Sequence, residues 1–141
     1  MEFDNVNVEV RKEQGNIGVA RAIYEYMKRG YTVLAPISDS DKYDLVVDDG
    51  VRLLKVQVKT TRCKIKDYSG RKVERVGYQV NLSTKGGNTK VNTIRFRQVN
   101  DYDVLFVLTE LGECWSIPTE ALGTAKNQIN VGTSKFEKFK L

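Results

Sequence analysis

Residues 43–60 have the sequence YDLVVDDGVRLLKVQVKT, and this stretch predicts a β-hairpin. A short apolar strand follows Asp44, and the Asp-Asp-Gly sequence of residues 48–50 suits a tight turn. Residues 51–60 are rich in β-branched side chains, which favour a second and longer strand. The stretch therefore indicates two antiparallel strands joined by one turn.

The second strand of this hairpin divides its side chains between two faces. Because side chains alternate across a strand, Gln57 and Lys59 project from one face, and Val56 and Val58 from the other, where they can pack under a helix. Asp44, at the mouth of the neighbouring strand, adds a carboxylate. Two oxygen ligands and a cation within reach of one phosphate indicate a metal-dependent site for cutting phosphodiesters. On these three residues alone, a solvated strand face without chemistry remains the alternative.

Composition limits the class of protein. At 141 residues and 40% hydrophobic side chains, residues 1–141 are expected to form a single domain. The sequence has no apolar run near the ~20 residues of a membrane span and no signal-peptide pattern at its start. Cys63 and Cys114 lie far apart in a chain without histidine, which argues against zinc sites and disulfides and excludes Ser-His triads. We expect a cytoplasmic protein without membrane association that uses oxygen-ligand chemistry.

Positive charge is concentrated in one part of the sequence. Residues 52–97 hold 13 basic and 2 acidic side chains, a net charge of +11. Such a density is typical of a surface that faces a polyanion, because each cation near a phosphate releases condensed counterions. Double-stranded DNA is the expected partner, and RNA or another acidic partner is the alternative. The residues expected to bind nucleic acid are Arg62, Lys64, Lys66, Arg71, Lys72, Lys85 and Lys90.

Hydrophobic periodicity predicts the remaining elements. Residues 17–29 carry a wide apolar arc at helical spacing, with Asn16 as a possible N-cap and Gly30 following the last turn. A continuous apolar run at residues 103–108 indicates a central buried strand. Weaker patterns predict an edge strand at residues 6–10, strands at 31–35, 76–82 and 93–99, a short helix after Pro118, and a polar tail from Ala125 in which Phe136 and Phe139 dock back. Residues 62–75 are expected to form a basic loop or a flexible hairpin tip, and residues 83–92 a loop.

Residues 15–61 (GNIGVARAIYEYMKRGYTVLAPISDSDKYDLVVDDGVRLLKVQVKTT) resemble the PD-(D/E)XK nucleases. The likeness is greatest to the group that includes group I intron-encoded homing endonucleases, in which Gln replaces the second acidic residue. It continues more weakly through residues 101–103, 115–118 and 127–129. The resemblance implies a restriction-endonuclease-like αβββαβ core, an α/β fold with a mixed central sheet flanked by helices. It also implies a metal-dependent DNA endonuclease of homing type, with a Holliday-junction or other structure-specific nuclease, or a catalytically silent DNA-binding module, as alternatives.

The same resemblance implies roles for individual residues. Asp44 and Gln57 would be catalytic residues and ligands of Mg²⁺, for which Mn²⁺ could substitute. The backbone carbonyl of Val58 would be a further ligand, and Lys59 would lie beside the scissile phosphate. Many relatives also carry a Glu on the first helix where this chain has Val19. Glu13 could replace that carboxylate if the preceding segment folds back.

The number of sites predicts an assembly. One chain has one candidate site, whereas a double-strand cut needs two sites on strands of opposite polarity. A homodimer is therefore expected, and the resemblance to intron-encoded enzymes favours a homotetramer.

Overall fold

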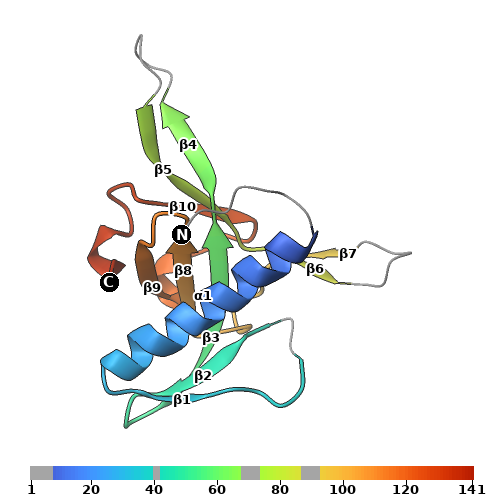
Figure 1. The fold of residues 1–141 in the computed structure, drawn as a ribbon, viewed down its shortest axis with the longest axis vertical. Coiled ribbons are helices and arrows are strands. Elements are labelled where there is room, and N and C mark those ends of the chain that lie inside the picture. Colours follow the sequence, from blue (N-terminus) through green and yellow to red (C-terminus); the bar gives the residue numbers. More distant parts are fainter. Residues whose placement is uncertain (1–7, 40–41, 68–73, 87–92) are drawn as a thin grey trace.

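The computed structural model describes residues 8–39, 42–67, 74–86 and 93–141 (Figure 1). Within them, no helix is both long and apolar enough to cross a membrane. The elements in chain order are α1 (Val8–Lys28), β1 (Thr32–Leu34), β2 (Leu45–Asp48), β3 (Leu53–Thr61), β4 (Cys63–Asp67), β5 (Glu74–Asn81), β6 (Thr84–Gly86), β7 (Thr93–Arg95), β8 (Val104–Thr109), β9 (Cys114–Pro118), α2 (Thr119–Leu122), β10 (Gln128–Val131) and the 3-10 helix η1 (Glu137–Phe139).

Five strands form the main sheet in the order β1-β2-β3-β8-β9. Neighbouring strands are antiparallel except β3 and β8, which run parallel with Gln57 opposite Leu105 and Lys59 opposite Val107. The hairpin of β2 and β3 is confirmed, and Gly50 in its turn has a φ of +92°. The central position of β8 is confirmed as well. This mixed sheet with α1 confirms the expected α/β fold class.

Two hairpins fill the connection from β3 to the parallel strand β8. They are formed by β4 with β5 and by β6 with β7, and Figure 1 shows them as two arms, one extending upward and one to the right. The hairpin that was one alternative for residues 62–75 is confirmed by the pairing of β4 with β5, whereas the loop predicted at 83–92 is strand over β6. Residues 68–73 and 87–92, between the paired strands, lie outside the described part.

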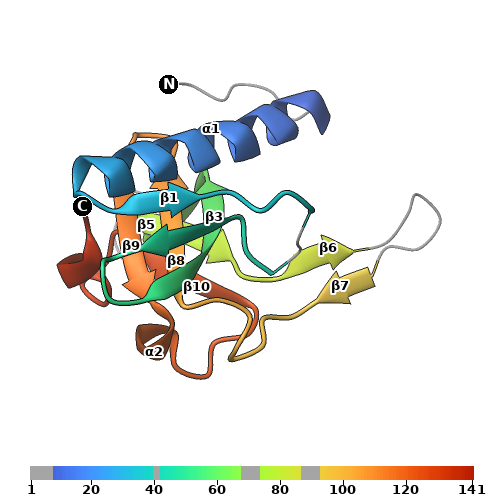
Figure 2. The same ribbon diagram turned by 90° about the horizontal axis from the view of Figure 1, so that it is seen from below.

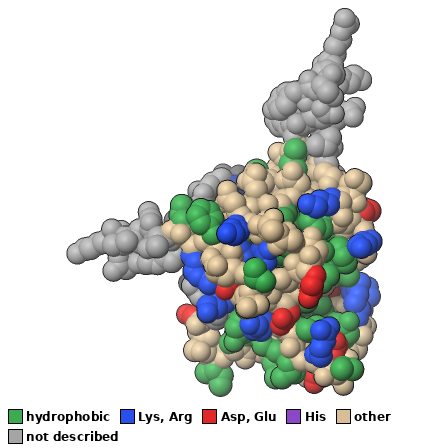
Figure 3. Space-filling model, turned by 180° about the vertical axis from the view of Figure 1, so that it is seen from behind, with side chains coloured by type: hydrophobic (Ala, Val, Ile, Leu, Met, Phe, Trp, Pro, Cys, Tyr) green, Lys and Arg blue, Asp and Glu red, His purple; other side chains and the backbone are tan. Residues whose placement is uncertain are grey.

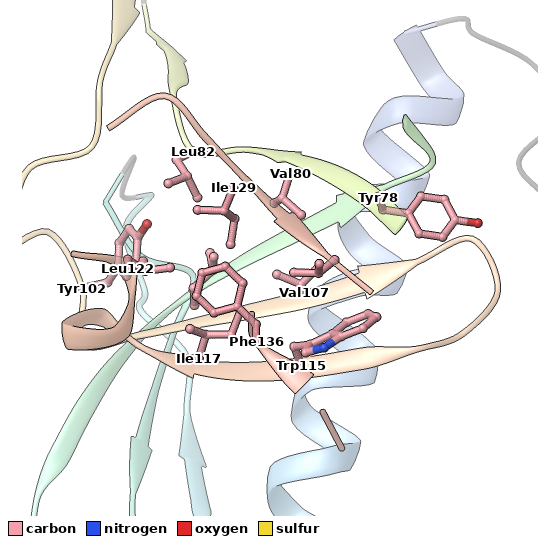
Figure 4. Packing of buried hydrophobic residues seen from close by; sticks show 12 residues of the cluster. Tyr78, Val80, Leu82, Tyr102, Val107, Trp115, Ile117, Leu122, Ile129 and Phe136 are labelled. Atoms are coloured by element: carbon pink, nitrogen blue, oxygen red, sulfur yellow. The ribbon is translucent and has the colours of Figure 1, made fainter. Parts of the chain in front are cut away.

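The main sheet is covered differently on its two faces. Helix α1 packs on one face, where Ala22 and Tyr26 join Val56 and Val58 in a buried cluster. A second sheet of order β10-β5-β4 lies toward the other face, and Figure 4 shows its side chains packed with those of the main sheet. Figure 2 shows α1 on one side and β10 and α2 on the other. The long helix α1 covers the first face, and the second sheet, the short helix α2 and the tail cover the second. The side chains buried on this second face form a second cluster. Its members are Tyr78, Val80, Leu82, Tyr102, Leu105, Val107, Trp115, Ile117, Leu122, Ile129, Val131 and Phe136.

Helix α1 is longer than predicted. It begins at Val8, so residues 8–10 are helical and the predicted edge strand is wrong over them. Asn16 lies inside the helix and is not its N-cap. The apolar arc is also narrower, because Tyr24 and Met27 are exposed while Glu25 is buried between two arginines. The predicted end of the helix is confirmed by Gly30, whose φ is +84°.

The tail contains a strand that the sequence pattern missed. Strand β10 pairs antiparallel with β5, with Gln128 opposite Asn81 and Ile129 opposite Val80. The predicted docking of the tail is confirmed by Phe136, which is 2% exposed in the second cluster. The short helix after Pro118 is also confirmed.

Candidate active site

The hairpin of β2 and β3 brings Asp44 against the middle of β3. The backbone N–H of Asp44 donates to the carbonyl of Val56 at 2.8 Å, which fixes the residue at the entry of β2. Its carboxylate oxygen Oδ2 accepts a hydrogen bond from Gln57 Nε2 at 2.7 Å and another from the backbone N–H of Val58 at 2.8 Å. Three of the residues singled out in the sequence therefore meet in one cluster.

Lys59 lies two residues further along β3, on the same face as Gln57. Its ammonium Nζ donates to the carbonyl oxygen of Ser83 at 3.2 Å. Burial lowers the pKa of Lys59, although the nearby Asp44 carboxylate opposes that shift. Burial likewise raises the pKa of Asp44, against the opposing hydrogen bond from Val58 and the charge of Lys59. Both groups are thus partly removed from water and interact with each other, as is common where proton and charge transfer occur.

The Gln57 amide shows where a cation would fit. Its nitrogen Nε2 lies 2.7 Å from Asp44 Oδ2 and 3.3 Å from the carbonyl oxygen of Val58, so one donor group contacts both oxygens. If the amide group of Gln57 rotates by 180°, Oε1 and Nε2 exchange positions, and the oxygen then faces the same side as Asp44 Oδ2 and the Val58 carbonyl. The cluster can then offer a carboxylate, an amide and a backbone carbonyl oxygen, which are ligands that hard cations such as Mg²⁺ accept. Among the described residues, three or more His, Cys, Asp or Glu side chains nowhere gather into a group that could hold a metal.

Asp48 and Asp49, in the turn of the hairpin, do not complete the cluster. Asp48 Oδ1 accepts from the backbone N–H of Gly50 at 2.8 Å, and Asp49 Oδ1 accepts from those of Val51 and Arg52 at 2.8 and 2.7 Å. Both side chains therefore stabilise the hairpin turn.

The two helix positions considered for a further carboxylate do not supply one. Glu13 is exposed and lies within α1, not ahead of it. Val19 is half-buried and packs against the helix-side cluster with Val56 and Val58. It therefore lies on the face of the sheet opposite to Gln57 and Lys59, as an ordinary core residue would.

A polar cavity that the sequence did not indicate adjoins Gln57. It has a volume of about 10 Å³, which suits a single water molecule, and Thr84, Arg97 and Tyr102 help to line it. Thr84 Oγ1, Arg97 Nη1 and the Tyr102 hydroxyl are buried and have no hydrogen-bond partner among the described residues. Burial raises the pKa of Tyr102 to about 12, so its hydroxyl keeps a proton to donate. Three hydrogen-bonding groups thus adjoin the Asp44 cluster, and no sequence motif marks them.

Of the residues expected to bind nucleic acid, the structure describes four, and three of these four lie in strands of the two arms. Arg62 is half-buried between β3 and β4, and Lys64 pairs with Glu110 at 3.2 Å. On the face in Figure 3, Lys and Arg are dispersed among Asp and Glu, so the basic block forms no single patch there. Lys66 and Lys85 lie in β4 and β6, whereas Arg71, Lys72 and Lys90 fall outside the described residues.

Comparison with known proteins identifies the family. A family model described as PD-(D/E)XK endonuclease matches residues 10–140. The chain belongs to the PD-(D/E)XK endonuclease family. A solved structure of a bacterial homing endonuclease, I-Ssp6803I, is similar to it at a TM-score of 0.66 and 28% sequence identity, covering 85% of this chain and 76% of that one. A search of curated proteins found no match.

Proposed function

We propose that the chain is an endodeoxyribonuclease that uses Mg²⁺ to hydrolyse phosphodiester bonds at specific sites in double-stranded DNA, as homing enzymes do. The observation that carries this proposal is the cluster of Asp44, Gln57 and the Val58 carbonyl beside the buried Lys59. Family membership supports nuclease chemistry, and the similarity to a homing endonuclease supports site-specific cleavage.

The chain's own residues have distinct parts in this proposal. Asp44, Gln57 and the Val58 carbonyl would hold the cation, and of these three Asp44 alone would contribute a negative charge. When bound, Mg²⁺ or Mn²⁺ polarises the phosphate and lowers the pKa of a bound water. Lys59 stabilises negative charge that develops on the phosphate, and the Ser83 carbonyl holds its ammonium in position at 3.2 Å. Because Lys59 and Asp44 are partly desolvated, their interactions with the phosphate and the cation are stronger than in water.

Cleavage of both strands requires two copies of this site. We therefore propose a homodimer or homotetramer, in which each chain supplies one cluster to one DNA strand.

A catalytically silent DNA-binding module is a second candidate. Two observations favour it: the described residues contain no gathering of three or more acidic or other metal-binding side chains, and Val19 packs in the core instead of supplying a helix carboxylate. A cation held by one carboxylate would then bind too weakly for turnover unless DNA phosphate completes its coordination.

Cleavage and metal binding can be measured on the same proteins. Purified protein is incubated with supercoiled plasmid and with branched DNA, in Mg²⁺, in Mn²⁺ and with a chelator, and metal binding is followed by calorimetry. Asp44→Asn and Lys59→Met should each abolish cleavage, and Asp44→Asn should also weaken cation binding. Asp48→Asn is the matched control, because the Asp48 carboxylate bonds only within the turn, to Gly50, among the described residues.

The outcomes separate the candidates. Metal-dependent nicking by the parent and Asp48→Asn proteins, and by neither site variant, supports the proposal. Nicking that survives Asp44→Asn overturns the site assignment. Cleavage of branched DNA alone would indicate a structure-specific nuclease, and DNA binding without cleavage under any condition would indicate the silent module.

A further inference from the structure

Strand β5 has an apolar inner face and an amide outer face. Tyr78 and Val80 are buried in the second cluster, whereas Gln79 and Asn81 alternate with them and point away from it. Gln79 is half-buried and Asn81 is exposed.

Strand β10 repeats this arrangement beside β5. Ile129 and Val131 are buried in the same cluster, and Gln128 and Asn130 are exposed between them. The antiparallel register places Gln128 opposite Asn81 and Asn130 opposite Gln79. The two strands therefore carry a two-by-two array of carboxamides on their outer surface, which we call the amide face (Gln79, Asn81, Gln128 and Asn130).

Strand propensity does not account for the two asparagines of this face, because Asn is depleted in β-strands. None of the four positions carries a charge. The amide face is thus neutral, although Gln79 and Asn81 belong to the strongly basic block of residues 52–97.

Hydrogen bonds fix part of the amide face in position. Asn81 Oδ1 accepts from the backbone N–H of Ser83 at 2.9 Å and from its hydroxyl at 2.7 Å, which turns the Asn81 NH₂ group away from that contact. Ser83 is also the residue whose carbonyl accepts from Lys59. The amide face therefore begins next to the candidate active site.

A hollow of about 480 Å³ lies at this end of the face. Residues that line it include Gln14, Arg62, Gln79, Asn81, Asn127 and Gln128. Thr60, Thr61 and Cys63 complete the lining, so five of the nine residues are carboxamides, and Arg62 adds one positive charge. Amides suit base edges and an arginine suits a phosphate, so the lining has the composition of a base-reading surface with one phosphate contact.

We propose that the amide face reads adenine-containing base pairs in the major groove of the DNA target. This inference rests on the proposed function. A carboxamide can bond both N6 and N7 of adenine, and the major groove admits a two-stranded β-ribbon. Outward side chains along one strand are about 6.8 Å apart, which is about two base-pair steps of 3.4 Å. Gln128 and Asn130, two residues apart along β10, therefore read adenines two base pairs apart.

The experiment uses the full chain and a randomised double-stranded DNA library. Fragments bound or cut in Mg²⁺ are sequenced for the parent protein and for Gln128→Ala, Asn81→Ala and Gln128→Glu. Gln98→Ala, which removes an exposed amide outside the face, is the control. Thermal unfolding of each variant establishes that it is folded.

Discrimination for adenine at one position should fall about 5- to 150-fold in Gln128→Ala, since one bidentate contact accounts for that range. Gln128→Glu should shift the preference toward cytosine, because a carboxylate accepts from cytosine N4. Gln98→Ala should select the parent sequence. If the parent protein selects a sequence and both Gln128 variants select the same one, the inference is overturned while the proposed function stands. A parent protein that neither binds nor cuts any DNA overturns the proposed function and the inference with it.

Discussion

Gly18 allows α1 to approach β3 more closely than any other residue type would. A Cβ atom at this position would lie 2.5 Å from Thr60 Cγ2 and 3.1 Å from Val58 Cγ1. Thr60 is β-branched and stiff at χ1, and it lies in a strand paired on both sides of its sheet, so neither contact relaxes easily. Gly15, in the same helix, has nothing within 4 Å of its equivalent Cβ position and provides a matched control.

Replacing each glycine by alanine should change the free energy of unfolding by different amounts. Each substitution gains about 1 kcal/mol of helix propensity. Gly18→Ala also overpacks the interface between helix and sheet, which costs about 1–3 kcal/mol. Gly15→Ala should therefore stabilise the chain, and the free energy of unfolding of Gly18→Ala should be about 1–3 kcal/mol lower than that of Gly15→Ala. At about 3 °C per kcal/mol for a domain of this size, the gap in Tm is about 3–9 °C.

Denaturant unfolding and DNA cleavage of both variants measure the effect. The Cβ atom of an alanine at position 18 would press on Val58, whose carbonyl belongs to the proposed cation site. Gly18→Ala should therefore also reduce cleavage by about tenfold or more. Thr60→Ser removes the obstructing methyl group, so the double variant should recover part of the loss. If Gly15→Ala and Gly18→Ala are equally stable, the close packing of α1 on β3 is wrong.

Two further predictions concern the site and its surroundings. Val19→Glu should lower the free energy of unfolding by about 1–3 kcal/mol, because it places a carboxylate among apolar side chains. Added Mg²⁺ should not restore the lost stability. If it does, residue 19 faces the proposed cation site and not the core. Because burial raises the pKa of Asp44, the folded state binds its proton more tightly than the unfolded chain, and ionisation destabilises the fold. The free energy of unfolding of Asp44→Asn relative to the parent should therefore grow as pH rises from about 3 to 7, in denaturant titrations without metal. If the difference in free energy of unfolding between the two proteins stays constant over this pH range, the Asp44 carboxyl is not buried as described.

Local patterns were sufficient for the hairpin and insufficient for the start of the helix. The hairpin is encoded by neighbours in sequence: Asp49 and Gly50 form the turn, and the strands pair across it. At the N-terminus, alternation in residues 6–10 suggested a strand. The helix-forming side chains that follow, and continuity with the packed part of α1, favour helix from Val8 instead.

Residues distant in sequence explain what could not be predicted around the site. Asp44, Gln57 and Lys59 lie within one hairpin, so their proximity follows from strand alternation. Arg97 and Tyr102 reach the cavity beside Gln57 only because β3 and β8 pair in parallel after a long connection. β10 was missed because asparagines and a glycine weaken its local strand signal, and pairing with β5 supplies what the local sequence lacks.

The hairpin arms between β3 and β8 also bear on how such a chain can diverge. Both ends of this connection are held in the main sheet, through six paired positions from Val56 with Val104 to Thr61 with Thr109. Doubling the length of a flexible connection costs only about 0.6 kcal/mol of closure entropy. Insertions or deletions in the arms outside residues 78–84, which pack in the second cluster and contact Lys59, therefore leave the Asp44 cluster almost undisturbed. A descendant of this chain can acquire a differently shaped arm, and contact a longer or shorter stretch of nucleic acid, while its central strands stay the same.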